Sequence, residues 1–465
     1  MRKEKDVLGV VEVPDNRLWG AQTQRCLNYF DIGTQTIPFG VVRALAIIKK
    51  AAAKTNVHFG LLDQQIAQAI DQAAQEVMDG KYNDEFPIPP WQTGSGTHSN
   101  MNANEVIANI ANKNLGHPIG QKHPVHPNDH VNLSQSSNDT FPTAMHIAFV
   151  QEVHHRLLPS LETLIEQLRL KQKTYEKTIK LGRTHFQDAT PMYAGQEIGA
   201  WASQIELAYK RIKSGLQAVY ELAQGGTAVG SGLNTPVGFD TLVCQYIADI
   251  TGLAFVSNPD KFAGLSGHDA LVGASGDLNQ LASTLLKLSN DVKILASGPR
   301  VGLAELIIPP NEPGSSIMPG KINPTQAEAL GMVACQVMGN HVAVSMAGSQ
   351  GQLQLNVFKP VIILNLLHSV ELLSDSITCF TKHCLAGMTY DVERLKELQD
   401  RSLMLVTALA PHIGYDKCAE IARKAHHDKS TLKEAALSLG YISAEDYDRI
   451  VRAEYMLSPF ETEEQ

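Results

Sequence analysis

Residues 271–295 read LVGASGDLNQLASTLLKLSNDVKIL, which is the most regular helical pattern in the chain. Its large apolar residues recur at intervals of three, four and seven: Leu271, Leu278, Leu281, Leu285, Leu288, Val292 and Leu295. This heptad spacing places them on one stripe of an α-helix, and such a stripe has to be covered by a partner helix. The segment therefore predicts a helical bundle.

Four more segments have helical periodicity, and with residues 271–295 they predict an all-α fold with a long central bundle. They span residues 145–175, 198–222, 325–346 and 362–384. Pro159 lies inside the first and should kink or break it, and Gly225-Gly226 should stop the second. Strand patterns are scarce, and residues 7–13 are the best candidate for a short strand or hairpin.

The most apolar stretch, residues 360–373, has apolar side chains on several faces of the expected helix. A helix that is apolar all round is buried, so we expect copies of the chain to cover one another in a homo-oligomer. Polar residues at 365, 368 and 371 interrupt the stretch, which is also shorter than the roughly 18 residues of a membrane span. We therefore expect no membrane partner.

The two flanks of the bundle differ from it and predict three domains, in line with about one domain per 150 residues. Residues 1–134 mix short helices with loops rich in Gly, Asn and Pro. Residues 135–392 hold the long helices, and residues 393–465 read as a small C-terminal helical domain.

The composition excludes several classes of partner. A net charge of −9 offers no broad basic surface, so we expect no nucleic acid, although one lysine in a cleft could hold a small dicarboxylate. The six cysteines form no CxxC pair, which favours free thiols in a reducing compartment. Because the first six residues, MRKEKD, contain no apolar signal segment, we expect a cytoplasmic protein.

Four polar segments interrupt the helical pattern, and the first is TGSGTHSNMN at residues 93–102. Its two glycines allow the backbone to come close to a ligand, and its hydroxyl and amide side chains are short neutral donors. A helix expected from about residue 104 would offer free N–H groups to an anion. Taken alone, a polar loop with a helix N-cap is the simpler explanation.

The second polar segment is HPVHPND at residues 123–129, followed by SQSSND at residues 134–139. His123, His126 and Asp129 have a spacing that metal ligands can have. A metal site is the weaker alternative, because two prolines break any single helical face and no second His or Cys motif completes the set. The serines of the second run form another cluster of donors.

The third segment is GRTH at residues 182–185, expected near the end of the helix that starts around residue 145. A lone histidine is more often structural than catalytic, but an imidazole side chain such as that of His185 can transfer protons near neutral pH. The fourth is GSSIMPGKINP at residues 314–324, where two glycines and two prolines shape a loop around Lys321. It is not a phosphate loop, because Ile322 replaces the required Ser or Thr.

In this order the four segments resemble the fumarase/aspartase superfamily of lyases, and residues 314–324 look like its signature loop. The resemblance covers essentially the whole chain, from LWGAQTQR at residues 18–25 to LVTAL at residues 405–409. This superfamily eliminates across a C–C bond to release fumarate or a fumaryl compound. TGSGT at residues 93–97 and SSND at residues 136–139 are similar to class II fumarase more than to its aspartase relatives.

Resemblance to class II fumarase implies an iron-independent hydratase of the citric acid cycle, which hydrates fumarate reversibly to (S)-malate. It implies an all-α, three-domain fold in which residues 1–134 form the N-terminal lyase domain. It also implies a homotetramer whose active sites are each built from three chains. The partners implied are small dicarboxylates, fumarate and malate, and no metal or organic cofactor is required.

The resemblance further implies roles for individual residues. Ser315 would be the base that takes the C3 proton of malate, and His185 the partner acid, acting through a water while Glu328 orients it. Lys321 and Asn323 would stabilise the intermediate, whose carboxylate becomes a dianion. The other residues expected to bind substrate are Ser95, Gly96, Thr97, Ser136, Ser137, Asn138, Thr184 and Ser316.

The family has a second carboxylate site, which corresponds here to His126, Pro127, Asn128 and Asp129. In many relatives an arginine lies three residues before this histidine, whereas this chain has His123 there, with Lys122 beside it. Two other functions stay open at this point. One is an ammonia-lyase of the same superfamily acting on aspartate, and the other is a non-catalytic structural homologue.

Overall fold

The structure is a computed structural model that describes residues 1–459. Its described part contains seventeen α-helices, and its strands form only two-stranded sheets. The all-α prediction is confirmed.

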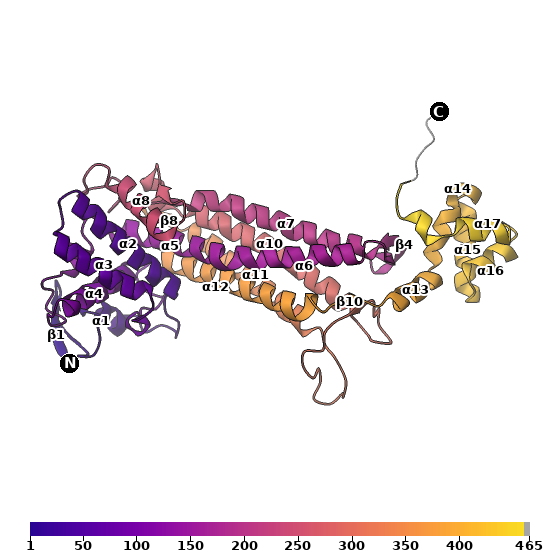
Figure 1. Cartoon of the computed structure of the whole chain (residues 1–465), viewed down its shortest axis with the longest axis horizontal. Helices are drawn as coiled ribbons and strands as arrows, with labels where there is room; N and C mark the ends of the chain where they lie inside the picture. The colour runs from indigo at the N-terminus through magenta and orange to yellow at the C-terminus, as the bar shows by residue number, and fades with distance from the viewer. Residues whose placement is uncertain (460–465) are drawn as a thin grey trace. The chain divides into compact units, whose positions relative to one another are not determined.

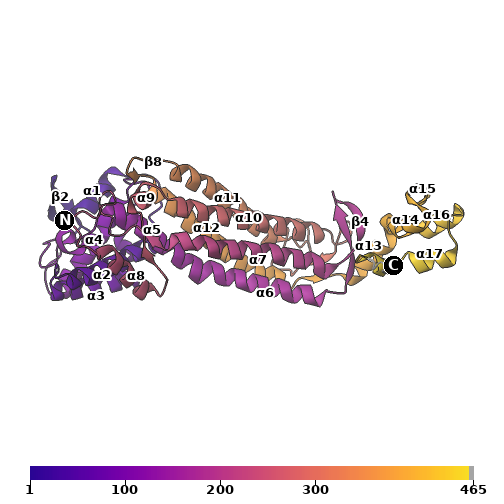
Figure 2. The ribbon, with the colours of Figure 1, turned by 90° about the horizontal axis from the view of Figure 1, so that it is seen from above.

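Five long helices dominate the chain and lie side by side in both views (Figures 1 and 2). They are α6 (Leu158–Thr174), α7 (Ala194–Val219), α10 (Asp269–Leu295), α11 (Thr325–Gly348) and α12 (Lys359–Phe380). The heptad residues of α10 are buried, with at most 7% of any of them exposed. The central bundle predicted from their spacing is confirmed.

The segment from residue 145 to 175, predicted as one interrupted helix, is two helices. α5 (Ser137–Glu152) ends in a single π-helical turn, Val153–Leu157, and α6 begins just before Pro159. A proline ring clashes with the carbonyl four residues back and provides no N–H, which accounts for the break at this place.

The N-terminal region contains longer helices than the sequence indicated. It begins with a hairpin of β1 (Arg2–Asp6) and β2 (Gly9–Val13), close to the predicted strand. The helices that follow are α1 (Ala21–Tyr29), α2 (Phe39–His58), α3 (Gln64–Met78) and α4 (Thr97–Asn114). The expectation of short helices is wrong for α2 and α4, which have 20 and 18 residues. Both bury residues on most of their faces, so no polar stripe marks their period in the sequence.

A second hairpin, β3 (Ile179–Thr184) with β4 (Gln187–Tyr193), was not predicted. The remaining strands have two residues each: β5 (Glu221–Leu222), β6 (Val256–Ser257), β7 (Leu306–Ile307), β8 (Gly351–Gln352), β9 (Leu355–Asn356) and β10 (Thr389–Tyr390). Two further helices, α8 (Phe239–Thr251) and α9 (Lys261–Ser266), lie between β5 and α10 in the sequence.

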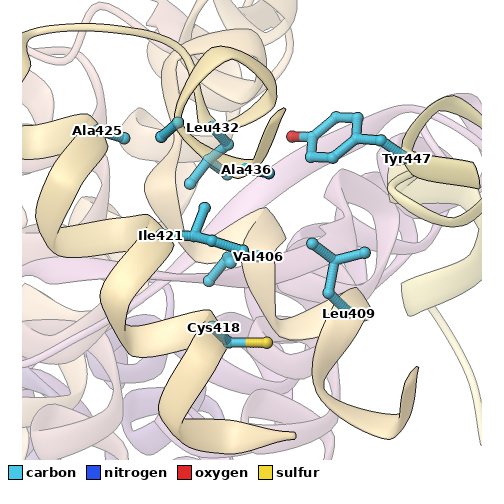
Figure 3. Packing of buried hydrophobic residues seen from close by; sticks show 9 residues of the cluster. Val406, Leu409, Cys418, Ile421, Ala425, Leu432, Ala436 and Tyr447 are labelled. Carbon is cyan, nitrogen blue, oxygen red and sulfur yellow. The ribbon is translucent and has the colours of Figure 1, made fainter. Parts of the chain in front are cut away.

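The C-terminal helices have a hydrophobic cluster of their own, shown in Figure 3. They are α13 (Val392–Arg401), α14 (Ala410–Ile413), α15 (Tyr415–Asp428), α16 (Leu432–Ser438) and α17 (Ala444–Ile450). Ile421 of α15 is fully buried in this cluster, with Leu409 and Tyr447 packed in it as well. The helical structure predicted from residue 393 onward is confirmed for the described residues.

The chain divides into two compact units. Unit 1 consists of Met1–Ser160, Ala208–Ser283 and Val333–Asp375, and unit 2 of Leu161–Leu207, Thr284–Met332 and the chain from Ser376 onward. The division into three domains at residues 134 and 392 describes the chain differently and stays a prediction.

The expectation that the apolar stretch at residues 360–373 is too short to span a membrane was wrong, whereas the homo-oligomer expected from it stays a prediction. The stretch belongs to a helical segment from Lys359 to Leu385 that, like α11, is long and apolar enough to span a membrane by length and composition alone. Half of its most apolar window is buried inside the chain, and Asn340 of α11 donates to Ser369 Oγ of α12 at 3.0 Å, as in a protein core. Ile362, Ile363 and Leu366 are at most 1% exposed, so the chain itself covers them and no second copy is needed there.

Candidate active site

In unit 1, the first polar segment forms the loop before α4. Gly96 caps this helix with a φ of 78°, and the helix begins at Thr97, earlier than the expected residue 104. A Cβ at Gly96 would overlap the ring of Phe141, and one at Gly94 would overlap the carbonyl oxygen of Val357. Both glycines are therefore required because the loop packs against its own chain, whereas the sequence suggested close approach to a ligand.

Short hydroxyl side chains surround the N-terminus of α4. Ser95 Oγ lies 2.8 Å from Thr97 Oγ1 and 3.3 Å from Thr93 Oγ1. Ser95 is only 8% exposed, whereas Thr97 is half-buried. Two of the first N–H groups of α4 already donate to side chains, Thr97 N–H to Ser95 Oγ at 3.4 Å and Ser99 N–H to Gln92 Oε1 at 3.1 Å. This end of α4 therefore presents chiefly hydroxyl groups.

The N-terminus of α5 is held in place by a buried carboxylate. Ser136 Oγ accepts the N–H of Asn138, and Asp139 Oδ1 accepts the N–H of Ser136 at 2.9 Å. The other carboxylate oxygen of Asp139 accepts the N–H groups of Gly225 and Thr227 at 3.0 and 2.9 Å. Burial raises the pKa of Asp139 to about 6. The start of α5 is therefore tied to the loop after β5.

One hydrogen bond joins the two helix N-termini. Asn100 of α4 donates to Ser137 Oγ of α5 at 2.9 Å. Asn100 in turn accepts from Lys49 Nζ of α2 at 2.7 Å, and Lys49 is completely buried. Lys49 was not predicted as a functional residue. The sequence pattern that could have indicated its burial is that Lys49 lies on the same helical face as Leu45 and Ala52, which are both buried.

The segment assigned to the second carboxylate site also lies in unit 1. His126 precedes a single π-helical turn, Pro127–Val131, and its Nδ1 accepts the N–H groups of Asn128 and Asp129 at 3.2 and 3.1 Å. Burial lowers the pKa of His126. Because Nδ1 accepts these two N–H groups, the proton of the ring lies on Nε2, which is left to donate to a ligand.

The alternative of a metal at His123, His126 and Asp129 finds no support in the geometry. Within residues 1–459, no three His, Cys, Asp or Glu side chains gather in a way that could hold a metal ion. The ring of His123 contacts the ring of His117 edge-on at 5.9 Å between centroids, and Lys122 Nζ donates to the carbonyl of Lys5 at 2.7 Å.

In unit 2, His185 lies at the tip of the β3–β4 hairpin, and the expected position near a helix end was wrong. Thr184 pairs with Gln187, so His185 and Phe186 form a two-residue turn with φ values of 56° and 61°. Such turns require positive φ at both positions and normally use Asn and Gly. A bulky residue held in this region costs about 1–3 kcal/mol, and strain of this kind concentrates at functional sites.

Charged residues hold the base of this hairpin. Arg183 forms an ion pair with Glu305, and Lys180 Nζ lies 2.8 Å from Glu305 and 2.7 Å from Glu197. Lys180 and Glu305 are each about 1% exposed. The strained tip of the hairpin is therefore supported at its base by a buried cluster of ion pairs.

The fourth polar segment, residues 314–323, is a loop closed on itself. Gly314 N–H donates to the carbonyl of Lys321 at 2.9 Å, and Asn323 Nδ2 donates to the carbonyl of Gly314 at 2.6 Å. Inside the loop, Ser315 Oγ accepts the N–H groups of Ile317 and Met318 at 3.2 and 2.9 Å. Backbone donors on a hydroxyl oxygen favour its negatively charged form.

Known protein families match the chain over most of its length. A family model described as "Lyase" matches residues 9–339, and one described as "Fumarase C C-terminus" matches residues 405–458. A protein named fumarate hydratase class II 1, from Pseudomonas aeruginosa, is 56% identical over 98% of this chain and 98% of its own length.

The chain belongs to the class II fumarate hydratase family. A mitochondrial fumarate hydratase from Rhizopus oryzae is also 56% identical, over 98% of this chain and 93% of its own length. The crystal structure of a class II fumarase from Schistosoma mansoni is 47% identical and superimposes with a TM-score of 0.95, covering 98% of both chains. The resemblance inferred from the four polar segments is confirmed, and so is the lyase class.

The residues assigned from the class II fumarase pattern fall into separate groups. Unit 1 brings together the donors at the starts of α4 and α5: Ser95, Gly96, Thr97, Ser136, Ser137 and Asn138. In unit 2, Thr184 and His185 lie on the hairpin, Ser315, Ser316, Lys321 and Asn323 in the loop, and Glu328 in the first turn of α11. Among residues 1–459, no hydrogen bond or ion pair links His185 to Ser315, Lys321 or Glu328.

Proposed function

We propose that this chain catalyses the reversible hydration of fumarate to (S)-malate, as its place in the fumarate hydratase family suggests. The observation that carries the proposal is the pair of backbone N–H groups directed at Ser315 Oγ in a loop that also contains Lys321. A serine hydroxyl is a very weak acid. It becomes a useful base when donors and a positive charge stabilise its alkoxide.

In the direction of dehydration, Ser315 takes the C3 proton of malate, and hydroxide then leaves C2. Between these steps the adjacent carboxylate becomes a dianion. The charge of Lys321 and the amide of Asn323 stabilise that dianion where its charge develops. One N–H of Asn323 is used to close the loop on Gly314, which fixes the direction of the amide before substrate binds.

His185 supplies a proton to the departing hydroxide through a water, and Glu328 orients the histidine. The positive φ values of the hairpin turn keep the imidazole exposed at the tip of a rigid support. Because no bond joins His185 to Glu328 within the described chain, we place their meeting between copies of the chain. Each active site is then built from three chains.

The substrate carboxylates are held by Thr97, Ser137, Asn138 and Thr184. The starts of α4 and α5 support this role, because the positive end of a helix dipole favours an anion. Ser95, Gly96, Ser136 and Ser316 shape the same surfaces. We assign His126, Pro127, Asn128 and Asp129 to the second carboxylate site.

We further propose a homotetramer assembled through the long helices. Support comes from α11, where exposed residues with small or apolar side chains follow a four-three-four spacing: Cys335, Gly339, Val342 and Met346. Val342 and Met346 are each 62% exposed, so this heptad stripe lacks a partner among residues 1–459. Sedimentation should give a tetramer, and a stable, active monomer at working concentration would refute the assembly.

We place the enzyme in the cytoplasm, with no cofactor and no nucleic-acid or membrane partner. All six cysteines are free thiols, as in a reducing compartment. Two relatives, from Rhizopus oryzae and Rattus norvegicus, are named as mitochondrial, so cell fractionation is the test of this placement.

The function is tested by following the ultraviolet absorbance of fumarate with malate and, separately, with aspartate. The proposal expects fumarate from malate and none from aspartate. Fumarate from aspartate alone would make the chain an ammonia-lyase, and no fumarate from either would make it a structural homologue.

A further inference from the structure

We propose that Lys49 is a positioning residue that sets the direction of a hydrogen-bond chain ending at the hydroxyl of Ser137, so that this hydroxyl donates to a dicarboxylate. The inference deepens the proposed function and rests on it, because it takes Ser137 as a contact of the substrate carboxylate. Lys49 itself touches no substrate in this account. It acts through Asn100.

The surroundings of Lys49 match an ammonium group. Its Nζ is fully buried and donates to three amide oxygens: Asn100 Oδ1 at 2.7 Å, Asn132 Oδ1 at 3.1 Å and Gln135 Oε1 at 2.9 Å. An ammonium has three donors and no acceptor. The neutral amine has only two N–H groups, and its lone pair would face the third of these oxygens.

Two of the three amides are fixed independently of the lysine. Asn132 Nδ2 donates to the carbonyl of Gln135, and Asn132 Oδ1 also accepts from Asn104 at 3.0 Å. Gln135 Nε2 donates to the carbonyls of Val131 and Leu133 at 3.0 and 3.1 Å. These bonds keep both side-chain oxygens directed at Lys49.

The third amide, Asn100, links Lys49 to Ser137 by hydrogen bonds. Its oxygen faces Lys49, so its Nδ2 donates to Asn132 Oδ1 at 3.1 Å and to Ser137 Oγ at 2.9 Å. If the amide were flipped, its N–H groups would point at the ammonium, where no acceptor exists. Lys49, together with the fixed oxygen of Asn132, therefore selects the orientation in which Ser137 receives a hydrogen bond.

The consequence appears at the hydroxyl of Ser137. A serine has one O–H donor and two acceptor lone pairs. With a lone pair occupied by Asn100, its proton is free to be donated to an anion. With Asn100 flipped, Ser137 would donate inward to the amide oxygen and present a lone pair to the substrate carboxylate, which repels it.

The charge balance of the network also suits an anionic ligand. In the described part of the chain, Lys49 forms no hydrogen bond to a carboxylate, and the acid whose charge acts on it is Asp139. Burial lowers the pKa of Lys49 to about 7, while the charge of Asp139 acts in the opposite direction. A dicarboxylate bound at Ser137 would add negative charge close to this network and help to keep the lysine protonated.

The first test is a double-mutant cycle on fumarate hydration with Lys49→Met, Ser137→Ala and the double variant. Loss of a hydrogen bond to a charged ligand corresponds to about a ten- to hundredfold rise in KM, with kcat changed far less. Once Ser137 is alanine, adding Lys49→Met should raise KM by less than about twofold, since its effect passes through that hydroxyl. Effects that multiply in the double variant would overturn the proposal.

Lys50→Met is the matched control. Lys50 follows on the same helix but pairs with Asp71 at 3.2 Å and Gln75 at 3.0 Å. This variant should leave KM unchanged. A rise in KM equal to that of Lys49→Met would mean that any lysine loss in α2 has the same effect, and the proposal would fail.

Asn100→Asp keeps the test decisive if Lys49→Met does not fold. The carboxylate still satisfies Lys49 but has no N–H to donate, so Ser137 must donate inward. We expect KM to rise at least about tenfold, with most of this rise absent in the Ser137→Ala background. A rise of the same size in both backgrounds would point to simple charge repulsion and contradict the inference. Wild-type protein that does not hydrate fumarate would instead refute the proposed function.

Discussion

The donor cluster at the starts of α4 and α5 and the two reactive segments of unit 2 are built in opposite ways. In unit 1, Asn100 and Asp139 are completely buried, and each makes several hydrogen bonds within the chain. In unit 2, Phe186 at the hairpin tip is 77% exposed and Ile317 in the loop is 83% exposed.

This difference separates the binding function from the chemical one. The unit 1 donors that we assign to the substrate carboxylates are arranged by a single chain before any ligand arrives. The groups that we propose exchange protons, Ser315 and His185, lie on segments whose large apolar side chains face solvent. Exposed apolar surface of this kind marks a contact face, which supports our proposal that other copies of the chain complete the site.

The largest effect should come from Ser315→Ala. Turnover of malate should fall by about 10⁴-fold or more, because the variant loses the base while the loop keeps its closing bonds at Gly314 and Asn323. Steady-state kinetics measure the loss, and sedimentation with circular dichroism checks that fold and assembly persist. A nearly normal rate would move the chemistry away from the loop.

The next effect is that of His185→Asn, for which we expect kcat to fall by about 10²–10⁴-fold. Asparagine tolerates positive φ better than histidine, so the hairpin should be as stable as before or more so. Thermal melting is the check on this second point. A low rate that coincides with a lower melting temperature would mean that His185 acts on structure instead of on the proton.

Lys321→Met should lower kcat/KM by about 10²–10³-fold, with a large part of the loss in kcat. The reason is that, in our proposal, Lys321 stabilises a dianion that exists only after the C3 proton has left. Kinetics on malate and on fumarate give the split. A rise in KM with kcat unchanged would show that the lysine only binds substrate, like the donors of unit 1.

His126→Asn should have the smallest effect and change kcat less than about threefold, because His126 belongs to the second carboxylate site in our proposal. The residue is well suited as a contrast, since its Nδ1 is already occupied by two backbone N–H groups. Malate turnover is measured beside Ser315→Ala. A crippled His126 variant and a normal Ser315 variant together would mean that the two sites have been exchanged.

The sequence predicted the features whose signal is local. The stripe of α10 was visible because one face is apolar and the others are polar, and Pro159 marked the break between α5 and α6. The loop at residues 314–324 was recognisable because its glycines, prolines and Lys321 form an uncommon combination.

The features that were missed depend on contacts between distant parts of the chain. The turn of the β3–β4 hairpin contains His and Phe. Asn and Gly at these two positions would have indicated a hairpin in the sequence. α2 is buried on most faces and so shows no period. Lys49 receives its role from Asn100, Asn132 and Gln135, which follow it by 51, 83 and 86 residues, and no local pattern carries that information.

The central claim is that the exposed reactive segments of different copies meet in one site, and mixing two inactive variants tests it most directly. His185→Asn and Ser315→Ala subunits with different affinity tags are co-expressed, and the mixed tetramers are purified by both tags in succession. If His185 and Ser315 come from different chains, about a quarter of the sites in randomly mixed tetramers contain both intact residues, and malate turnover returns to roughly that fraction of wild type. If both residues come from the same chain, every site carries a lesion, and mixed tetramers as inactive as their parents would contradict the claim.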